Sequence, residues 1–337
     1  MNTNYRESRQ RKMSNQRHLL SASDISKQQL LSYVELAEDF RTNLDPDCPQ
    51  SVHKFVLMSN QFPDKTIINM FCEPSTRTNC SFQAAAIKLG CKVITLSDEE
   101  SSTKKGESLE DTIKTLGYYG DAIVLRHPAR GAASLVAAGS RVPIINAGDG
   151  TGEHPTQALL DVFTIYSELK KRHIELDNKN RQPIRITFVG DLKNSRTIHS
   201  LIRLLTYFPI LQFFYVSPES LEMPLEIVEF VGRKYDQHKL KSVSDAIYNT
   251  DVLYMTRIQK ERFSTETEYD AIMADSESYS LTPNILNLAK EQMILMHPLP
   301  RLQEIPAELD GDRRSVYFKQ VENGLYMRMA ILSKLFR

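Results

Sequence analysis

The amino-acid sequence predicts an α/β protein with two doubly wound parallel-sheet domains linked by helices. Short apolar runs that are typical of buried strands alternate with helical patterns from about residue 65 to residue 297. Such alternation indicates parallel sheets with right-handed crossover connections. The polar stretch at 177–183 separates a first series of elements from a second. At 337 residues, the chain is long enough for two hydrophobic cores.

Each element is predicted from its apolar spacing, in chain order. Segment 24–40 has helical spacing, and Ser23 or Asp24 can serve as its N-cap. The first domain should contain strands near 65–71, 92–96, 121–126 and 143–147, and helices near 76–89, 107–118, 130–139 and 155–172. The second should contain strands near 184–189, 211–216, 251–256 and 293–297, and helices near 196–207, 224–234 and 282–290. Segment 320–336 predicts a final amphipathic helix.

Composition excludes several classes of function. The 42 basic and 42 acidic residues balance, whereas a general nucleic-acid or membrane-surface binder needs a basic excess. No uncharged apolar run approaches the length of about 18 residues that suggests a transmembrane helix. Cys48, Cys72, Cys80 and Cys91 form no CxxC pair. We therefore expect reduced thiols, no structural zinc, a cytoplasmic location, and neither nucleic-acid nor membrane partners.

The first 18 residues form a separate, basic segment. They carry five basic residues against the single acidic Glu7, with Ser, Asn and Gln between them. This composition is typical of a flexible tail. An organelle transit peptide is the alternative interpretation, although the segment lacks a clear apolar face.

Six apolar runs each end in a short polar motif that suits an anion or a carbonyl group. Ligands of open α/β sheets bind just outside the carboxyl ends of the strands, so six such motifs together predict one site. The motifs are CEPSTRT at 72–78, Arg126, GDGTGEHPTQ at 148–157, GDLKNSRT at 190–197, TRIQ at 256–259 and HPLPR at 297–301.

The first motif has the donors of a phosphate site. Pro74 ends the strand, and Ser75 can cap the helix that follows. Free backbone N–H groups at a helix start favour an anion. Thr76 and Thr78 add hydroxyl groups, and Arg77 adds a guanidinium that suits phosphate. An ordinary helix cap with a surface arginine is the alternative.

The next two motifs suit a carbonyl group. Arg126 ends an apolar strand, where a charge needs a partner or a ligand; a structural salt bridge is the competing interpretation. His154 can donate to a carbonyl oxygen, and Gln157, one helical turn later, can pair with an amide. Pro155 is well placed to begin that helix. A lone histidine is more often structural, but its position after a flexible GDGTG loop favours function.

The last three motifs suit a dicarboxylate and an amine. Arg196 begins a helix, and Arg257 precedes Gln259 in TRIQ. Two arginines that converge from separate strands would suit a dicarboxylate, although each could instead form a surface ion pair. The HPLP turn exposes backbone carbonyls that could accept from an amine, and it is suited to a cis X–Pro bond. The residues of SSTKKGES, 101–108, by themselves favour a solvated surface loop.

Taken together, the motifs predict chemistry by positioning and electrostatics. Their arginines concentrate positive charge at one sheet edge of a neutral protein, which suits a multiply anionic small ligand. They contain neither a nucleophile–base pair nor a metal-ligand spacing such as HExxH. We therefore expect no cofactor and no metal, and stabilisation of a transferred group by fixed charges.

STRT, HPTQALLD and HPLPR in combination resemble the aspartate/ornithine carbamoyltransferase family, over nearly the whole chain from about residue 19. The resemblance implies a carbamoyl-phosphate domain at 19–160, with a helix at 318–337 packing back on it, and an L-aspartate domain at 161–317. It implies carbamoyl transfer to the amine of aspartate, giving N-carbamoyl-L-aspartate and phosphate, early in de novo pyrimidine biosynthesis. It also implies a homotrimer with shared active sites, and leaves regulatory or pathway-enzyme partners open.

Position by position, the resemblance also implies roles for single residues. The phosphate cradle would be Ser75, Thr76, Arg77 and Thr78. Arg126 and His154 would polarise the carbamoyl carbonyl and Gln157 would contact its amide, so that the catalytic set is Arg77, Thr78, Arg126 and His154.

The remaining implied roles concern aspartate and the subunit boundary. Ser101 and Lys105 match a loop that enters the neighbouring subunit's site, with Lys105 contacting both substrates. The aspartate set would be Lys105, Arg196, Arg257 and Gln259. Leu299 and Pro300 would form the turn that contacts both substrates, with a cis bond between them.

Three alternatives predict different residues. An ornithine-specific relative should have HCLP and an SMG motif, whereas this chain has HPLP and TRIQ. A nicotinamide-dependent dehydrogenase should have GxGxxG after a strand, but ITFVGDLKNSRT has a single glycine. A non-catalytic binding paralogue should lack some site positions, and none of those named is missing.

Overall fold

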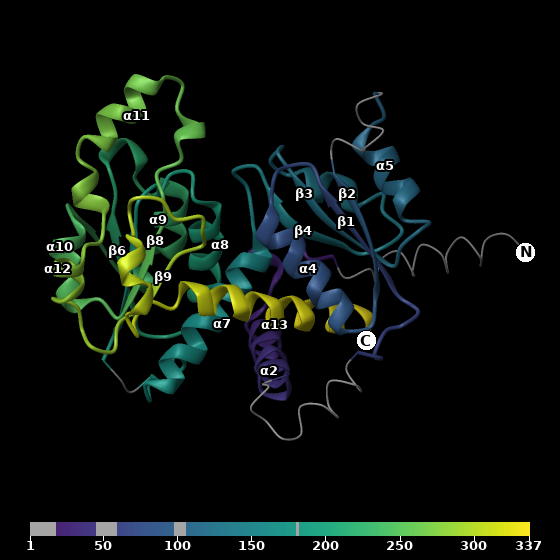
Figure 1. The fold of residues 1–337 in the computed structure, drawn as a ribbon, viewed down its shortest axis with the longest axis horizontal. Helices are drawn as coiled ribbons and strands as arrows, with labels where there is room; N and C mark the ends of the chain where they lie inside the picture. Colours follow the sequence, from purple (N-terminus) through teal and green to yellow (C-terminus); the bar gives the residue numbers. More distant parts are fainter. Residues whose placement is uncertain (1–17, 45–58, 98–105, 180–181) are drawn as a thin grey trace, which may run out of the picture. The chain divides into compact units, whose positions relative to one another are not determined.

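The structure, a computed structural model, describes residues 18–44, 59–97, 106–179 and 182–337 (Figure 1). It divides into two compact units, one formed by residues up to 159 together with 324–337, and the other by 160–323. The boundaries predicted from the sequence lie after residues 160 and 317. Each unit contains one sheet in which all strands are parallel. The predicted fold class is therefore confirmed.

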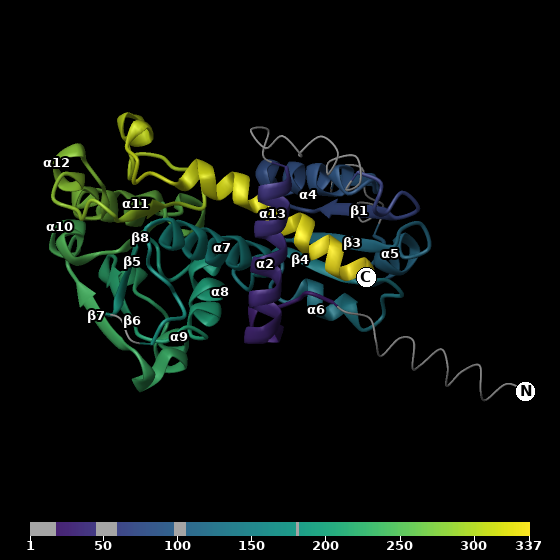
Figure 2. The same cartoon turned by 90° about the horizontal axis from the view of Figure 1, so that it is seen from below.

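The first unit contains a four-stranded sheet of order β2-β1-β3-β4. Its strands are β1 (Thr66–Phe71), β2 (Lys92–Ser97), β3 (Ala122–His127) and β4 (Ile144–Asp149). Its helices are α2 (Lys27–Asn43), α4 (Thr76–Lys88), α5 (Leu109–Leu116) and α6 (Ala132–Ala137). Figure 2 shows α4 and α6 on opposite faces of the sheet. Apolar side chains of β1, β3 and β4 form a core with α5 and α6.

The second unit contains a five-stranded sheet of order β7-β6-β5-β8-β9. Its strands are β5 (Ile184–Val189), β6 (Leu211–Val216), β7 (Asp236–Leu240), β8 (Val252–Met255) and β9 (Ile294–Met296). Its helices are α8 (Arg196–Leu205), α9 (Leu225–Val231), α10 (Val243–Ala246), α11 (Glu266–Met273) and α12 (Pro283–Leu286). The helices α7 (Pro155–Lys171) and α13 (Tyr317–Phe336) each contain residues of both units.

The first helix begins later than predicted. Its N-cap is Ser26, whose side chain accepts from the backbone N–H of Gln29. Asp24 belongs instead to a separate 3-10 turn, where its carboxylate accepts from the N–H of Ser21 at 3.2 Å. The prediction of Ser23 or Asp24 as the N-cap was wrong. The segment contains two capping boxes in succession, and Asp24 belongs to the first, with Ser21, whereas the helix begins at the second, with Ser26.

Several elements of the second unit differ from the predictions. Strand β7 was missed because its sequence, DQHKL, is polar and mostly exposed, as suits the edge of a sheet. Helix α11 was missed because none of its residues is fully buried and its apolar side chains, Tyr269, Ile272 and Met273, occupy only one turn. Helix α9 ends at Val231, where Gly232 takes a φ of +59°. Helix α12 spans only four residues of the helix predicted at 282–290.

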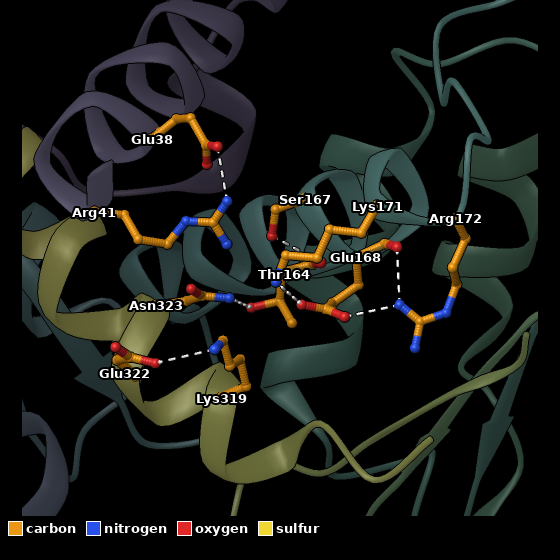
Figure 3. A network of polar contacts seen from close by, with 10 residues as sticks. All are labelled: Glu38, Arg41, Thr164, Ser167, Glu168, Lys171, Arg172, Lys319, Glu322 and Asn323. Carbon is orange, nitrogen blue, oxygen red and sulfur yellow. Dashed lines mark hydrogen bonds and ion pairs between the residues drawn. The ribbon is translucent and has the colours of Figure 1, made fainter. Parts of the chain in front are cut away.

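Residues of α7 and α13 within the second unit form buried polar contacts. The carboxylate of Asp161, which is fully buried, accepts from Tyr254 Oη at 2.7 Å and from Gln320 Nε2 at 2.6 Å. Asn323 Nδ2 donates to Thr164 Oγ1 at 3.1 Å, as Figure 3 shows. Since a buried carboxylate is costly unless its oxygens are satisfied, these contacts fix how α7, α13 and β8 pack.

Residues 324–337 contact α2 and α4 within the first unit. Lys334 bonds to Ser32 Oγ of α2. Arg328 Nη1 donates to Ser81 Oγ of α4 at 3.1 Å, and its guanidinium lies 5.2 Å from the centre of the Phe82 ring. The end of the last helix therefore packs on the first unit. No helix in the described part of the chain combines the length and the apolar character that crossing a membrane requires.

We predict that Tyr254→Phe destabilises the protein by about 1–3 kcal/mol, because it leaves a buried carboxylate with one donor fewer. The midpoint of urea denaturation measures the effect. Tyr248→Phe is the matched control, since the Tyr248 side chain is 56% exposed and should change stability by less than about 0.5 kcal/mol. Equal midpoints for both variants would show that the contact with Asp161 contributes nothing measurable.

Candidate active site

Both sheets have a topological switch point, and predicted motifs follow the strands on either side of it. In the first unit the winding reverses between β1 and β3, and in the second between β5 and β8. No crossover covers the carboxyl ends of the strands at such a point, which is where ligands of open α/β sheets bind. CEPSTRT follows β1, Arg126 lies in β3, GDLKNSRT follows β5 and TRIQ follows β8.

The start of α4 presents donors without using its own serine as a cap. Ser75 occupies the N-cap position, but its side chain makes no capping hydrogen bond, so the predicted cap was wrong in this respect. The first turn contains no acidic residue. Thr76 and Arg77 are exposed, whereas Thr78 is buried. A helix start that carries arginine in place of an acidic residue opposes the helix dipole unless an anion binds there.

Arg126 lies beside this helix start. The register pairs it with Phe71, the last residue of β1, and its carbonyl accepts from the N–H of Cys72 at 2.8 Å. Its Nε donates to Glu73 Oε2 at 3.1 Å, and Nη1 lies 3.5 Å from the Ala147 carbonyl oxygen. Burial lowers the pKa of Arg126; Glu73 opposes this shift, and the positive charge of Arg77 adds to it. The two guanidiniums are therefore close enough to repel each other, and a multiply charged anion would relieve that repulsion.

His154 and Gln157 lie at the start of α7, which begins at Pro155 as predicted. The His154 side chain is 4% exposed, and its Nδ1 lies 3.5 Å from Thr156 Oγ1. The carbonyl of His154 accepts from the N–H groups of Gln157 and Ala158 at 3.0 and 3.1 Å. The loop before it, 150–153, leaves the end of β4, which pairs with β3. Arg126, within β3, and His154, which follows β4, therefore belong to neighbouring strands of one sheet.

The loop after β5 is held tightly against the end of β8. Gly190 has a φ of +111°, and a Cβ there would lie 2.1 Å from the Thr256 carbonyl oxygen, so only glycine fits. The fully buried Asp191 accepts from the N–H and Nδ2 of Asn194 at 3.0 and 3.1 Å. Burial raises the pKa of Asp191; the bonds from Asn194 and from the Gln259 backbone, and the charge of Arg257, oppose this shift.

These contacts place Arg196 and Arg257 at one switch point. Arg196 is the first residue of α8, whose first turn has no acidic residue and whose N-cap, Ser195, makes no capping hydrogen bond through its side chain. Arg257 Nη1 donates to Glu261 Oε2 at 2.9 Å. The hydrogen bond with Glu261 raises the pKa of Arg257 against the effect of burial, with the charges of Glu261, Glu304 and Asp191 assisting. Gln259 lies two residues after Arg257.

The HPLP turn after β9 is shaped by His297. Its Nδ1 accepts from the N–H of Leu299 at 2.8 Å, so Nε2 carries the proton and donates to Glu304 Oε1 at 2.9 Å. Leu299 has a φ of +57°, and the Leu299–Pro300 bond is cis, which confirms that prediction. Neither proline has an N–H group, and that of Leu299 is taken. The turn can therefore offer a ligand only carbonyl oxygens, which suits an amine.

The buried side chains around these motifs were not predicted from the sequence. Glu304 accepts from the N–H of Leu302 as well as from His297, and Gln320 Oε1 accepts from the N–H of His297 at 3.0 Å. Only the polar character of Gln320 at a buried position of the last helix could have signalled it. Ser101 and Lys105 lie outside the described residues. Within the described part of the chain, no group of three or more His, Cys, Asp or Glu side chains could hold a metal ion.

Comparison with known families identifies both halves of the chain. Residues 17–167 match the model of the aspartate/ornithine carbamoyltransferase carbamoyl-P binding domain. Residues 182–335 match that of the aspartate/ornithine carbamoyltransferase Asp/Orn binding domain. The two matched domain models are described by different ligands, carbamoyl phosphate for the first and aspartate or ornithine for the second.

The relatives include both multifunctional and separate proteins. The chain is 46% identical over 317 residues to the multifunctional protein CAD of Squalus acanthias, covering 94% of this chain but 13% of that protein. It is 44% identical over 320 residues to the aspartate carbamoyltransferase catalytic subunit of Archaeoglobus fulgidus, covering 95% of this chain and 99% of that one. The chain thus corresponds to a small part of some relatives and to nearly the whole of others.

Solved structures show the same fold. Aspartate transcarbamoylase from Trypanosoma cruzi, in complex with N-(phosphonacetyl)-L-aspartic acid, is 37% identical with a TM-score of 0.84, over 94% of each chain. The catalytic subunit of Methanocaldococcus jannaschii aspartate transcarbamoylase is 40% identical with a TM-score of 0.81, over 95% of this chain and 97% of that one. The first of these binds a ligand that joins a phosphonate to an aspartate.

We predict that Glu304 makes the HPLP turn sensitive to acid. Burial alone would raise its pKa, but the hydrogen bonds that Glu304 accepts from His297 and from the N–H of Leu302 outweigh burial, so the pKa of Glu304 lies below the ordinary 4.5. A carboxyl group with a lowered pKa stabilises the folded state above its unfolded pKa, and this contribution is lost as the pH falls through the folded value.

The test compares urea denaturation of the unaltered protein and Glu304→Gln across that range. The stability difference should be largest at neutral pH and shrink as the pH falls below 4.5. Glu308→Gln, at an exposed position of the turn Ala307–Gly311, should run parallel to the unaltered protein. A pH-independent difference for Glu304→Gln would contradict the prediction.

Proposed function

The chain belongs to the aspartate/ornithine carbamoyltransferase family, and we propose that it transfers the carbamoyl group of carbamoyl phosphate to the amine of L-aspartate. The products are N-carbamoyl-L-aspartate and phosphate, an early step of de novo pyrimidine biosynthesis. One observation carries the proposal, namely that each sheet has a pair of arginines beside its switch point, Arg77 with Arg126 and Arg196 with Arg257. One pair suits a phosphate with its carbonyl, and the other suits two carboxylates.

The reaction needs positioned charges more than proton-transfer groups. The aspartate amine attacks the carbonyl carbon, and negative charge develops on the carbonyl oxygen. We assign the stabilisation of that oxyanion to Arg126, His154 and Thr78, because donors fixed in advance are most effective where charge develops in the transition state. The bond from carbon to the phosphate oxygen then breaks, and the departing phosphate takes the amine proton. Since phosphate is itself a base, no side chain has to remove that proton.

Substrate choice follows from the second unit. Arg257 already holds a carboxylate, that of Glu261, through both terminal nitrogens, which is the bidentate geometry that guanidinium groups favour. A second guanidinium on α8 suits the other carboxylate of aspartate, whereas the cationic side chain of ornithine would be repelled. The acceptor-only HPLP turn, through Leu299 and Pro300, suits the attacking amine.

We further propose a cytoplasmic homotrimer with shared active sites, in which Ser101 and Lys105 complete a neighbour's site. An exposed apolar edge in the first unit supports a subunit contact. Strand β2 is an edge strand whose Ile94 is 41% exposed, and Ile87 of α4, which packs against β2, is 62% exposed. Relatives that are multifunctional proteins support association with other enzymes of the pathway.

The first test is substrate choice. With carbamoyl phosphate, the purified protein should release phosphate when given L-aspartate and not when given L-ornithine, because Arg196 and Arg257 suit the two carboxylates of aspartate. Product identity should be checked by mass spectrometry. Arg257→Ala should raise the KM for aspartate by tenfold or more, the order expected for a lost charge-assisted contact of about 1.5–3 kcal/mol. Turnover with ornithine, or an unchanged KM in the variant, would overturn the assignment.

The second test is subunit complementation. Arg77→Ala and Lys105→Ala should each abolish transfer, since one loses the phosphate cradle and the other the neighbour's lysine. Mixed trimers of the two should regain activity, because some sites then combine an intact cradle with an intact lysine. Arg77→Ala mixed with Arg126→Ala is the control and should stay inactive, since both residues belong to the same subunit's set. No recovery in verified mixed trimers would argue against sharing.

A further inference from the structure

We propose that Asp149 is a positioning residue that sets His154 against the end of β3, which carries Arg126. The inference rests on the proposed function, in which these two residues polarise the carbamoyl carbonyl. Asp149 is the last residue of β4, and its side chain is 4% exposed. A buried carboxylate at a strand's carboxyl end beside an anion site needs a reason, because its charge opposes that of the substrate.

The carboxylate joins the two loops that leave β3 and β4. Its Oδ2 accepts from the N–H of Gly131 at 2.8 Å, in the loop that follows β3. Its Oδ1 accepts from the N–H of Glu153 at 2.6 Å, in the loop that follows β4. Glu153 directly precedes His154. One side chain therefore fixes the backbone next to His154 relative to the loop that continues from Arg126.

The backbone around Asp149 leaves this loop little freedom. The N–H of Asp149 donates to the Glu153 carbonyl at 3.2 Å, and the N–H of Gly152 donates to the Asp149 carbonyl at 2.8 Å. The N–H of Gly150 donates to the His127 carbonyl at 2.9 Å. Gly150 has a φ of +52°, and a Cβ there would lie 2.2 Å from the Pro128 carbonyl oxygen. The loop is therefore held to the end of β3 both by backbone hydrogen bonds and by the Asp149 carboxylate.

A carboxylate is required because both partners are donors. An ionised carboxylate accepts at both oxygens, whereas an amide of the same shape would turn its own N–H₂ toward one of the two backbone N–H groups. Asp149→Asn thus loosens one of the two loops with almost no change in volume. A shift of about 1 Å in a catalytic group can cost as much as about 10² in rate, so the loss should appear in turnover.

The experiment is a double-mutant cycle with His154→Ala, measured as kcat and KM for carbamoyl phosphate. Asp149→Asn should lower kcat by roughly tenfold or more while KM changes much less, since His154 acts on charge that develops in the transition state. In the His154→Ala background, Asp149→Asn should have almost no further effect, because the group that it positions is gone. The proposal would be overturned if the two substitutions lowered kcat by factors that multiply in the double variant, or if Asp149→Asn left kcat unchanged.

Two further variants separate positioning from folding. Asp121→Asn is the matched control, because Asp121 Oδ2 also accepts a backbone N–H, that of Thr66 at 2.9 Å, but lies directly before β3 at the opposite end of the strand. It should leave kcat unchanged. Gly152→Ala displaces the carboxylate without altering its charge, since the new Cβ would lie 2.6 Å from Asp149 Oδ1. It should lower kcat in the same way, and it replaces Asp149→Asn in the cycle if that variant fails to fold.

The outcomes also distinguish this proposal from the one on which it rests. If the unaltered enzyme converts no aspartate, the proposed function fails and the role of Asp149 fails with it. If the unaltered enzyme turns over and the effects in the cycle multiply, the function stands and only the role of Asp149 is overturned.

Discussion

Parallel pairing is the constraint on which the rest of this structure depends. When every strand of a sheet runs the same way, all of its carboxyl ends meet at one edge, and reversal of the winding leaves one gap there without a crossover. The chain meets this condition twice, between β1 and β3 and between β5 and β8. Strand order places residues as distant in sequence as Arg77 and Arg126, or Arg196 and Arg257, beside the same switch point.

Concentrating arginines at these gaps has an electrostatic cost, and the protein offsets it with its own carboxylates. Glu73 bonds to Arg126, and Glu261 bonds to Arg257. These carboxylates stabilise the charges of Arg126 and Arg257 in the free protein. At Arg126, the charge of Glu73 opposes the repulsion from Arg77. A substrate anion must therefore share or replace an internal carboxylate. Binding affinity then depends on how much stronger the ion pair between arginine and substrate is than the ion pair between arginine and the internal carboxylate. A ligand with a single negative charge therefore gains little binding free energy.

The sequence predicted what periodicity and chain order can specify. Strands β5 and β6 begin and end where they were expected, and the cis bond at Leu299–Pro300 was implied by the family resemblance. Strand β7 is polar, and helix α11 has no fully buried residue, so little in their sequences distinguishes them from loops. The sequence could not predict that the Ser75 hydroxyl makes no capping hydrogen bond, because a serine at an N-cap position usually makes one. Ser101 and Lys105 came from the resemblance alone, since their residue types suit any solvated loop.

The sequence could not show what fixes the backbone of each motif. In each case the backbone is fixed by a side chain that was not among the predicted ligand-binding groups. Asp149 accepts from the backbone before His154, Asp191 from that before Arg196, and Gln320 from that of His297, whose ring accepts from Leu299. In all four cases a buried acceptor binds a backbone N–H group at or beside one of the six motifs predicted to bind substrate. Such acceptors fix main-chain geometry without adding a titrating group that faces the ligand. A reaction in which the departing phosphate can remove the amine proton gains most from fixed geometry. The four buried acceptors accordingly fix the backbone and take no part in proton transfer.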